Sequence, residues 1–133
     1  RTLMIFGTGT DIVKVSRLEK WVNDRSMIER YFNAKEIKEA DYDSLNERQK
    51  SALCQHYAAR FAAKEAFSKA LGTGITGFDL RDVYIQNEES GKPYIVLENS
   101  AEKVFQNLCP GARLFVSLSH EKEYALANVI IEN

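Results

Sequence analysis

The pattern of hydrophobic and polar positions predicts mostly helices in the first half of the chain and mostly strands in the second. Residues 3–6 are apolar and run into GTGTD, which predicts a short buried strand ending in a turn. From Ile12 onward, apolar residues at helical spacing predict a helix that ends near residues 23–24. Its apolar positions are Val15, Leu18, Trp21 and Val22. Residues 27–32 and 34–40 predict two further short helices.

The longest predicted element is a helix over residues 46–71. Asn46 is a favoured N-cap residue, and Gln49 completes a capping-box pattern with it. The buried stripe of this helix includes Leu53, Tyr57 and Phe61. Gly72 suits the position just after the helix, because glycine readily adopts the left-handed conformation that ends many helices. We expect so long a helix to lie centrally in the fold, packed on a sheet.

Residues 81–86 and 94–97 predict two strands joined by a turn at 88–93. The alternation in the first strand places Val83 and Ile85 on a buried side and the positions between them on the other. A capping-box pattern, Asn99 with Glu102, then opens a helix that runs to about Leu108.

Two β-rich segments, 113–119 and 124–131, close the chain as a predicted antiparallel hairpin. The order of elements therefore predicts an α+β fold, an antiparallel sheet with helices on one face. The 133 residues are expected to form one domain, 1–133. Eighteen basic and nineteen acidic side chains give a net charge of -1, which favours neither nucleic acid nor a membrane surface as partner. No apolar run is long enough to span a bilayer, and no signal peptide is visible.

Cysteines and histidines give weak signals of chemistry here. Cys54 and Cys109 are not arranged as a metal site and are interpreted as reduced, mostly buried thiols of a cytoplasmic protein. His120 lies at a predicted strand end, where a lone histidine is more often structural. His56 lies within the long helix and is interpreted as non-catalytic.

Residues 60–74, RFAAKEAFSKALGTG, carry the stronger signal. Glu65 and Lys69 are four residues apart and therefore share a helix face. One interpretation is an ordinary surface pair, worth about 0.2–0.5 kcal/mol. The other is a binding or catalytic site, because the surrounding alanines and phenylalanines leave little room for a solvated face. Lys64 and Ser68 are expected to hold the solvent side of this segment.

Asp11 allows a more specific hypothesis when it is combined with Glu65. Alone, it is equally well interpreted as an N-cap. Two carboxylates with room for water and phosphate oxygens suit Mg²⁺. Lys69 and the backbone amides of residues 72–77 (GTGITG) could then hold phosphate oxygens, as phosphoryl transfer requires.

Three segments of the chain resemble, in order, the motifs of the holo-acyl-carrier-protein synthases, the small phosphopantetheinyl transferases. GTGTDIVKVSRL is similar to the family's opening GxGxDIxxxxRI, and RFAAKEAFSKALGTGI to its central (F/W)xxKEAxxKAxGTGI. GKPYIVL followed by FVSLSHEKEYALANVII is similar to its closing GxPxxxL…VSxSHxxxxAxAxVI. The resemblance covers almost the whole chain. It implies the 4′-phosphopantetheinyl transferase fold, with the antiparallel sheet packed against the long central helix.

The resemblance also implies a reaction. The 4′-phosphopantetheine arm of coenzyme A is moved to a serine of apo acyl carrier protein, in support of fatty acid biosynthesis, and adenosine 3′,5′-bisphosphate is released. Asp11 and Glu65 would be the Mg²⁺ ligands. Glu65 would take the proton from the serine, directly or through a metal-bound water. Lys69 would neutralise the pyrophosphate and help the leaving phosphate depart.

The resemblance further implies which residues meet each partner. Those lining the coenzyme A site would be Arg60, Lys64, Lys69, Gly74, Pro93 and His120. Small members of this family are homotrimers with the active site between subunits, so a trimer is expected. Acyl carrier proteins are acidic, and the first helix offers Lys14, Arg17 and Lys20 to steer one. Only Arg17 holds a strongly characteristic position, and the alternative for this patch is an ordinary solvated face.

Two other classes of function stay open at the sequence level. A coenzyme A- or carrier-binding module would not need Asp11, Glu65 and Lys69 together. A nucleotide pyrophosphatase would use the same metal and cations but would release phosphopantetheine to water.

Overall fold

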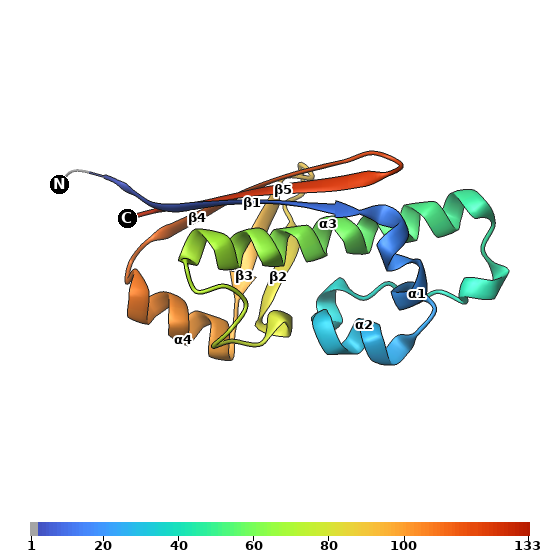
Figure 1. The fold of residues 1–133 in the computed structure, drawn as a ribbon, viewed down its shortest axis with the longest axis horizontal. Helices are drawn as coiled ribbons and strands as arrows, with labels where there is room; N and C mark the ends of the chain where they lie inside the picture. Colours follow the sequence, from blue (N-terminus) through green and yellow to red (C-terminus); the bar gives the residue numbers. More distant parts are fainter. Residues whose placement is uncertain (1–2) are drawn as a thin grey trace.

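The central element of the computed structural model, which describes residues 3–133, is the long helix α3 (Glu47–Leu71). It packs against a three-stranded antiparallel sheet, as Figure 1 shows. The strands of this sheet, in spatial order, are β1 (Ile5–Lys14), β5 (Tyr124–Glu132) and β4 (Arg113–His120). A separate antiparallel pair lies beside it, formed by β2 (Val83–Asn87) and β3 (Pro93–Leu97). The predicted α+β class with a long central helix is confirmed.

The remaining elements are short and lie around α3 and the β2–β3 pair (Figure 1). They are η1 (Val15–Leu18), α1 (Glu19–Val22), α2 (Arg25–Tyr31), η2 (Ala34–Glu36), η3 (Tyr42–Ser44), η4 (Leu80–Asp82) and α4 (Asn99–Leu108). The three-stranded sheet turns its other face away from all of them (Figure 1). Large apolar side chains from each of its strands are exposed, namely Ile12, Phe115, Tyr124 and Leu126.

Both predicted boundaries of the long helix are confirmed. The Asn46 side chain accepts a hydrogen bond from the backbone N–H of Gln49 at 2.8 Å, and Gln49 returns one to the N–H of Asn46 at 3.0 Å. Gly72 ends the helix with a φ of 87°, the left-handed conformation that glycine adopts without strain. The helix has its predicted bounds because neighbouring residues form hydrogen bonds with the free backbone groups at both of its ends.

The segment GTGTD is the clearest departure from the sequence prediction, because it lies inside β1 and forms no turn. A β-carbon on Gly7 would lie 2.0 Å from the carbonyl oxygen of Ala70, and one on Gly9 would lie 1.9 Å from that of Ala66. These glycines therefore let the strand lie directly on the helix backbone. Asp11 follows on the same face of β1, so its interpretation as an N-cap is wrong.

Four local predictions are wrong, wholly or in part, because tertiary contacts decide these segments. The helix expected from Ile12 begins only at Val15, as η1 followed by α1, because β1 continues to Lys14 in its pairing with β5. Of residues 34–40, only η2 is helical. The capping box at Asn99 is absent: Glu98 is the N-cap, without a side-chain bond, and the Asp82 carboxylate accepts from the N–H of Ser100 at 3.1 Å. Tyr84 is buried between Val83 and Ile85, so the predicted alternation of β2 is also wrong.

Candidate active site

Asp11, Glu65 and Lys69 come together where β1 crosses α3. The Lys69 ammonium lies 3.0 Å from Oδ1 of Asp11 and donates a second bond, also 3.0 Å, to the carbonyl oxygen of Thr10. Strand alternation places Asp11 two residues beyond Gly9 on the face toward α3, where the helix presents Glu65 and Lys69 one turn apart. Because Gly7 and Gly9 have no β-carbon, the strand lies against the helix backbone and its carboxylate comes close to the charged pair of the helix.

The charge of Asp11 acts on the carboxyl group of Glu65. Burial raises the pKa of the Glu65 carboxyl, and the nearby negative charge of Asp11 raises it further, while Lys69 and Arg17 act in the opposite direction. A carboxylate shifted toward neutrality in this way is a better proton acceptor than an exposed one.

The two carboxylates offer part of a metal shell. Among residues 3–133 no cluster of three or more acidic, histidine or cysteine side chains is placed to hold an ion. Mg²⁺ commonly takes one or two protein carboxylates and completes its shell with water and substrate phosphates. The donor chemistry of Asp11 and Glu65 therefore fits Mg²⁺ with a phosphate-bearing substrate.

Gly74 lies in the loop that follows α3, and its φ of 66° is in the left-handed region that favours glycine. The side chains of the loop threonines bond within the loop: Thr73 donates to the carbonyl oxygen of Gly74 at 2.8 Å, and Thr76 to that of Thr73 at 3.0 Å. The loop is exposed over most of its length. Its predicted role in holding phosphate oxygens stays a prediction.

Arg60 lies on a different face of α3 from Glu65, because five residues turn a helix by about 140°. Its guanidinium donates to the carbonyl oxygen of His56 at 3.2 Å and to Oδ1 of Asn87 in β2 at 3.4 Å. Its Nε is buried and has no hydrogen-bond partner within the described part of the chain. Burial lowers the pKa of Arg60, against the opposing charge of Glu36.

Lys64 and Ser68 do not hold the solvent side of the helix, so that prediction is wrong. Lys64 is completely buried, and its ammonium lies 2.6 Å from Oε1 of Glu36. Burial lowers the pKa of Lys64, although the Glu36 charge opposes this shift. All hydrogen bonds of its ammonium are to groups inside the protein. Lys64 therefore does not line a coenzyme A site in this chain, contrary to what the resemblance implied. Ser68 is also buried and donates to the carbonyl oxygen of Glu65 at 2.7 Å.

Sequence reasoning missed Glu36 altogether. Glu36 is 28 positions from Lys64, in a segment predicted only as a short helix. The capping box of η2, formed by Asn33 and Glu36, was the available local signal. That signal accounts for a helix start and gives no indication of a buried charge.

The other predicted coenzyme A residues lie on separate elements. His120, at the end of β4, is exposed, and its Nδ1 lies 2.9 Å from Oε1 of Gln55 near the start of α3. Pro93 begins β3. Within residues 3–133 no hydrogen bond joins these residues or Arg60 to the Asp11–Glu65–Lys69 group. One chain therefore brings together the predicted metal ligands and Lys69 but does not bring them to the remaining predicted residues.

The predicted partner-binding cations all lie exposed at the end of β1 and along η1 and α1. They are Lys14, Arg17 and Lys20. Arg17 is held most firmly: its guanidinium carbon lies 5.3 Å from the ring centre of Phe61 and 6.0 Å from that of Trp21. Its charge also acts on the Glu65 carboxyl, so Arg17 connects this surface to the site.

Comparison with known families assigns this chain to a class of transferases. A family model described as the 4′-phosphopantetheinyl transferase superfamily matches residues 7–129. The chain belongs to this superfamily.

Its relatives within the superfamily share one name. The chain is 46% identical over 129 residues to a holo-[acyl-carrier-protein] synthase of Treponema denticola, covering 97% of this chain and 99% of the relative. It is 44% identical over 133 residues to one of Geobacter sp. strain M21, with 97% and 99% covered.

Solved structures agree with these relatives. The acyl carrier protein synthase of Plasmodium yoelii with ADP bound superposes with a TM-score of 0.82 at 29% identity, covering 100% of this chain and 98% of that one. The holo-(acyl-carrier-protein) synthase of Bacillus anthracis in complex with CoA (3′,5′-ADP) gives 0.74 at 34% identity, with 98% of each chain covered. Among residues 3–133 no helix is both long and apolar enough to cross a membrane.

Proposed function

We propose that this protein transfers 4′-phosphopantetheine from coenzyme A to a serine of an apo acyl carrier protein. The observation that carries the proposal is the convergence of Asp11, Glu65 and Lys69 from two elements in a member of this superfamily. A protein that only bound coenzyme A would gain nothing from holding two carboxylates close together, because like charges repel and one of them is shifted toward protonation.

The residues divide the work of the transfer. Glu65 takes the proton from the serine hydroxyl, whose oxygen then forms a bond to the phosphorus next to the pantetheine arm. The bond from that phosphorus to the bridging oxygen breaks, and the electron pair leaves with adenosine 3′,5′-bisphosphate. Lys69 lies at the same place and neutralises the charge that develops on the leaving phosphate.

Asp11 and Glu65 would hold Mg²⁺, which when bound supplies positive charge to the pyrophosphate. Lys69 forms an ion pair with Asp11 at the same place. In the Glu65→Gln variant we expect transfer to be lost, because the side chain can neither accept the proton nor bind the ion as a carboxylate.

The test is the intact mass of an apo acyl carrier protein after incubation with the enzyme, coenzyme A and Mg²⁺. A mass gain of one phosphopantetheine, abolished by EDTA and by Glu65→Gln, would support both the reaction and the metal. The matched control is Glu102→Gln, an exposed glutamate of α4 without hydrogen bonds from its side chain. Full transfer by Glu65→Gln would refute the assignment, and release of free phosphopantetheine without a carrier would indicate a pyrophosphatase.

The acidic carrier would approach over the exposed cations of η1 and α1, with Arg17 as the residue nearest the site. Opposite charges on the two surfaces would speed the encounter in a salt-dependent way. Fatty acid biosynthesis in the cytoplasm is the process we assign to it. The two cysteines, which are free and buried, support a reducing compartment.

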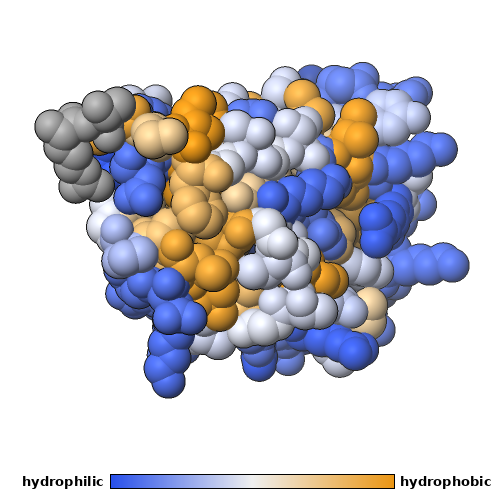
Figure 2. All heavy atoms as spheres, turned by 60° about the vertical axis from the view of Figure 1, so that its left-hand side comes forward, coloured by the Kyte–Doolittle hydropathy of each residue, from blue (hydrophilic) through white to orange (hydrophobic). Residues whose placement is uncertain are grey.

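A homotrimer with sites between subunits completes the proposal. Figure 2 shows a broad apolar area on the surface beside the N-terminal end of β1. The open face of the sheet adds exposed Ile12, Phe115, Tyr124 and Leu126. Apolar surface of this extent is typical of an interface. A neighbouring copy could also bring its Arg60 and His120 to the Asp11–Glu65–Lys69 group, which one chain does not do. The match of one family model to residues 7–129 supports a single domain over residues 1–133 in each copy.

A further inference from the structure

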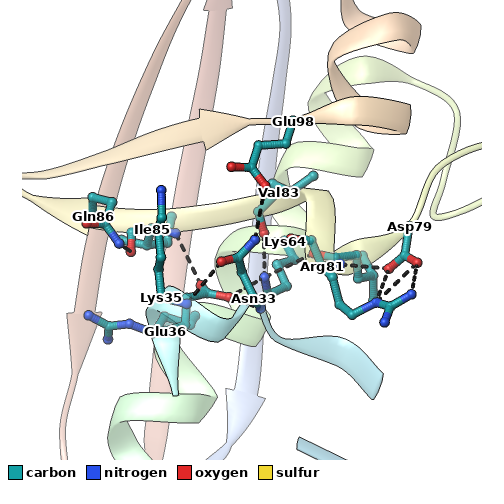
Figure 3. Close-up of polar contacts among 12 residues, drawn as sticks. Asn33, Lys35, Glu36, Lys64, Asp79, Arg81, Val83, Ile85, Gln86 and Glu98 are labelled. Carbon is teal, nitrogen blue, oxygen red and sulfur yellow. Dashed lines mark hydrogen bonds and ion pairs between the residues drawn. The ribbon is translucent and has the colours of Figure 1, made fainter. Parts of the chain in front are cut away.

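A buried ion pair lies on a neighbouring face of the helix that carries Glu65. The side chains of Lys64 and Glu36 are both fully inaccessible to solvent. Besides its 2.6 Å contact with Glu36, the Lys64 ammonium donates to the carbonyl oxygen of Leu80 at 3.0 Å and to that of Val83. Figure 3 shows these partners converging from η2, η4 and β2 on the lysine. All three donors of the ammonium are therefore used inside the protein.

Glu36 is held as completely as its partner. Its Oε2 accepts from the backbone N–H of Ile85 at 3.1 Å, and its Oε1 accepts from that of Asn33, also at 3.1 Å. The backbone carbonyl of Glu36 lies 2.7 Å from Nε2 of His56, two helical turns before Lys64. Glu36 thus contacts α3 at two points about two turns apart and joins it to β2.

Stability alone is a weak reason for this arrangement. Removing two charges from water costs as much as their attraction returns, and apolar residues of similar size often do as well. An ion pair restricts the orientation of the helix, because the Lys64 ammonium must lie where all three of its donors have acceptors. Apolar packing at the same place would tolerate small rotations of the helix.

The orientation of the helix matters here because Glu65, the residue after Lys64, belongs to the proposed site. Neighbouring side chains leave a helix about 100° apart, so fixing Lys64 toward η2 and β2 turns Glu65 toward β1 and Asp11. On that other side, Gly7 and Gly9 set only how close β1 lies to the helix backbone. We propose that Glu36 and Lys64 form a positioning pair that fixes the rotation of α3 about its axis and so aims Glu65 at Asp11.

This inference rests on the proposed function for the role of Glu65, but it can be tested separately. The variant Lys64→Met keeps the length of the side chain and removes its charge and donors. Its matched control is Lys103→Met, at an exposed lysine of α4 whose side chain makes no hydrogen bond in the structure. Both are compared with the unaltered protein well below their melting temperatures.

In Lys64→Met we expect turnover at saturating coenzyme A and carrier to fall about 100-fold, the cost of a displacement of the order of 1 Å in a catalytic group. Calorimetric titration of Mg²⁺, with coenzyme A present in every sample, should show weaker metal binding. Coenzyme A binding without metal should be unchanged. Lys103→Met should match the unaltered protein in all three measurements.

Two results would overturn the inference. Unchanged turnover and Mg²⁺ binding, with only a lower melting temperature, would make the pair purely structural. Weaker coenzyme A binding with unchanged Mg²⁺ binding would mean that Lys64 contacts coenzyme A. If Lys64→Met does not fold, Glu36→Gln is measured in its place, because it keeps the shape of the side chain, and the same outcomes apply. Failure of the proposed function would appear instead as full transfer by Glu65→Gln, whatever Lys64→Met does.

Discussion

His56 shows at the residue scale how a side chain near the site serves stability and not chemistry. Its Nε2 lies 2.7 Å from the carbonyl oxygen of Glu36, so the neutral ring donates a hydrogen bond from Nε2 to this oxygen. Burial lowers the pKa of His56 to about 4, and the charges of Arg60 and Lys38 contribute in the same direction. Its interpretation as non-catalytic agrees with this environment.

The predicted consequence is a loss of stability in acid. Between pH 6.5 and about 4 the unfolded chain binds a proton on His56 that the folded chain does not, so the free energy of unfolding falls as the pH falls through this window. Across the whole window the loss should be about 3 kcal/mol. Urea unfolding of His56→Gln, whose amide can still donate to Glu36, should lack this part of the pH dependence. An equal dependence in both proteins would contradict the assigned pKa, and His120→Gln is the control.

Arg17 is the residue for which carrier binding can be tested most directly. Its guanidinium rests on Phe61 and Trp21, which keeps it extended over the surface beside the site. We expect Arg17→Ala to raise KM for the carrier by about 10-fold and to reduce the sensitivity of this KM to salt, with coenzyme A binding unchanged. Steady-state kinetics at several ionic strengths measure both, with Lys103→Ala as control. A fall in turnover alone would assign Arg17 to the chemistry instead.

At the scale of elements, the contact of β1 with α3 decides the geometry of the site. We predict that Gly9→Ala destabilises the protein by about 3 kcal/mol or more, because the new β-carbon would meet the backbone of Ala66, which cannot move aside as a side chain can. The control is Thr8→Ala, on the exposed side of the same strand. Thermal and urea unfolding give the difference. A loss of similar size in both variants would mean that alanine simply weakens the strand.

This contact also explains what the sequence could and could not predict about the elements. The ends of α3 were predictable because Asn46, Gln49 and Gly72 act on their own neighbours in the chain. The glycines of GTGTD were interpreted as a turn because their partners, the carbonyls of Ala66 and Ala70, lie some sixty residues away. Local patterns cannot report such a contact.

The same distinction holds for the site. Glu65 and Lys69 were predicted together because helical spacing joins them, and Asp11 was added through chemistry and resemblance. The ion pair between Asp11 and Lys69, at 3.0 Å, could not be predicted from any sequence pattern, because the two residues are far apart in the chain. Lys64 was placed on the wrong side because its partner Glu36 comes from a distant segment.

At the scale of the whole molecule, the separation of Arg60 from Glu65 predicts complementation between subunits. Glu65→Ala and Arg60→Ala should each be nearly inactive alone. When the two are reassembled together, some interfaces would combine an intact Glu65 of one chain with an intact Arg60 of another, and part of the activity should return. The measurement is carrier modification before and after mixing.

A second mixture serves as the control for this prediction. Glu65→Ala mixed with Asp11→Asn should stay inactive, because both residues come from the same chain and no interface is restored. Activity that does not return in the first mixture would contradict a site shared between subunits. A molecular mass in solution that matches one chain would contradict the trimer itself.

The alternation of β1 has a consequence for how the length of this chain can vary. Asp11 faces the helix and its neighbour Ile12 faces the open side of the sheet, so one strand carries both a residue of the proposed site and part of the apolar surface. Inserting or deleting a single residue between Gly7 and Asp11 would exchange the two faces, turning the carboxylate outward and the isoleucine into the helix. The turn at residues 88–91, which is exposed, could change length without such an exchange. Changes in chain length should therefore be tolerated between β2 and β3 and excluded from β1.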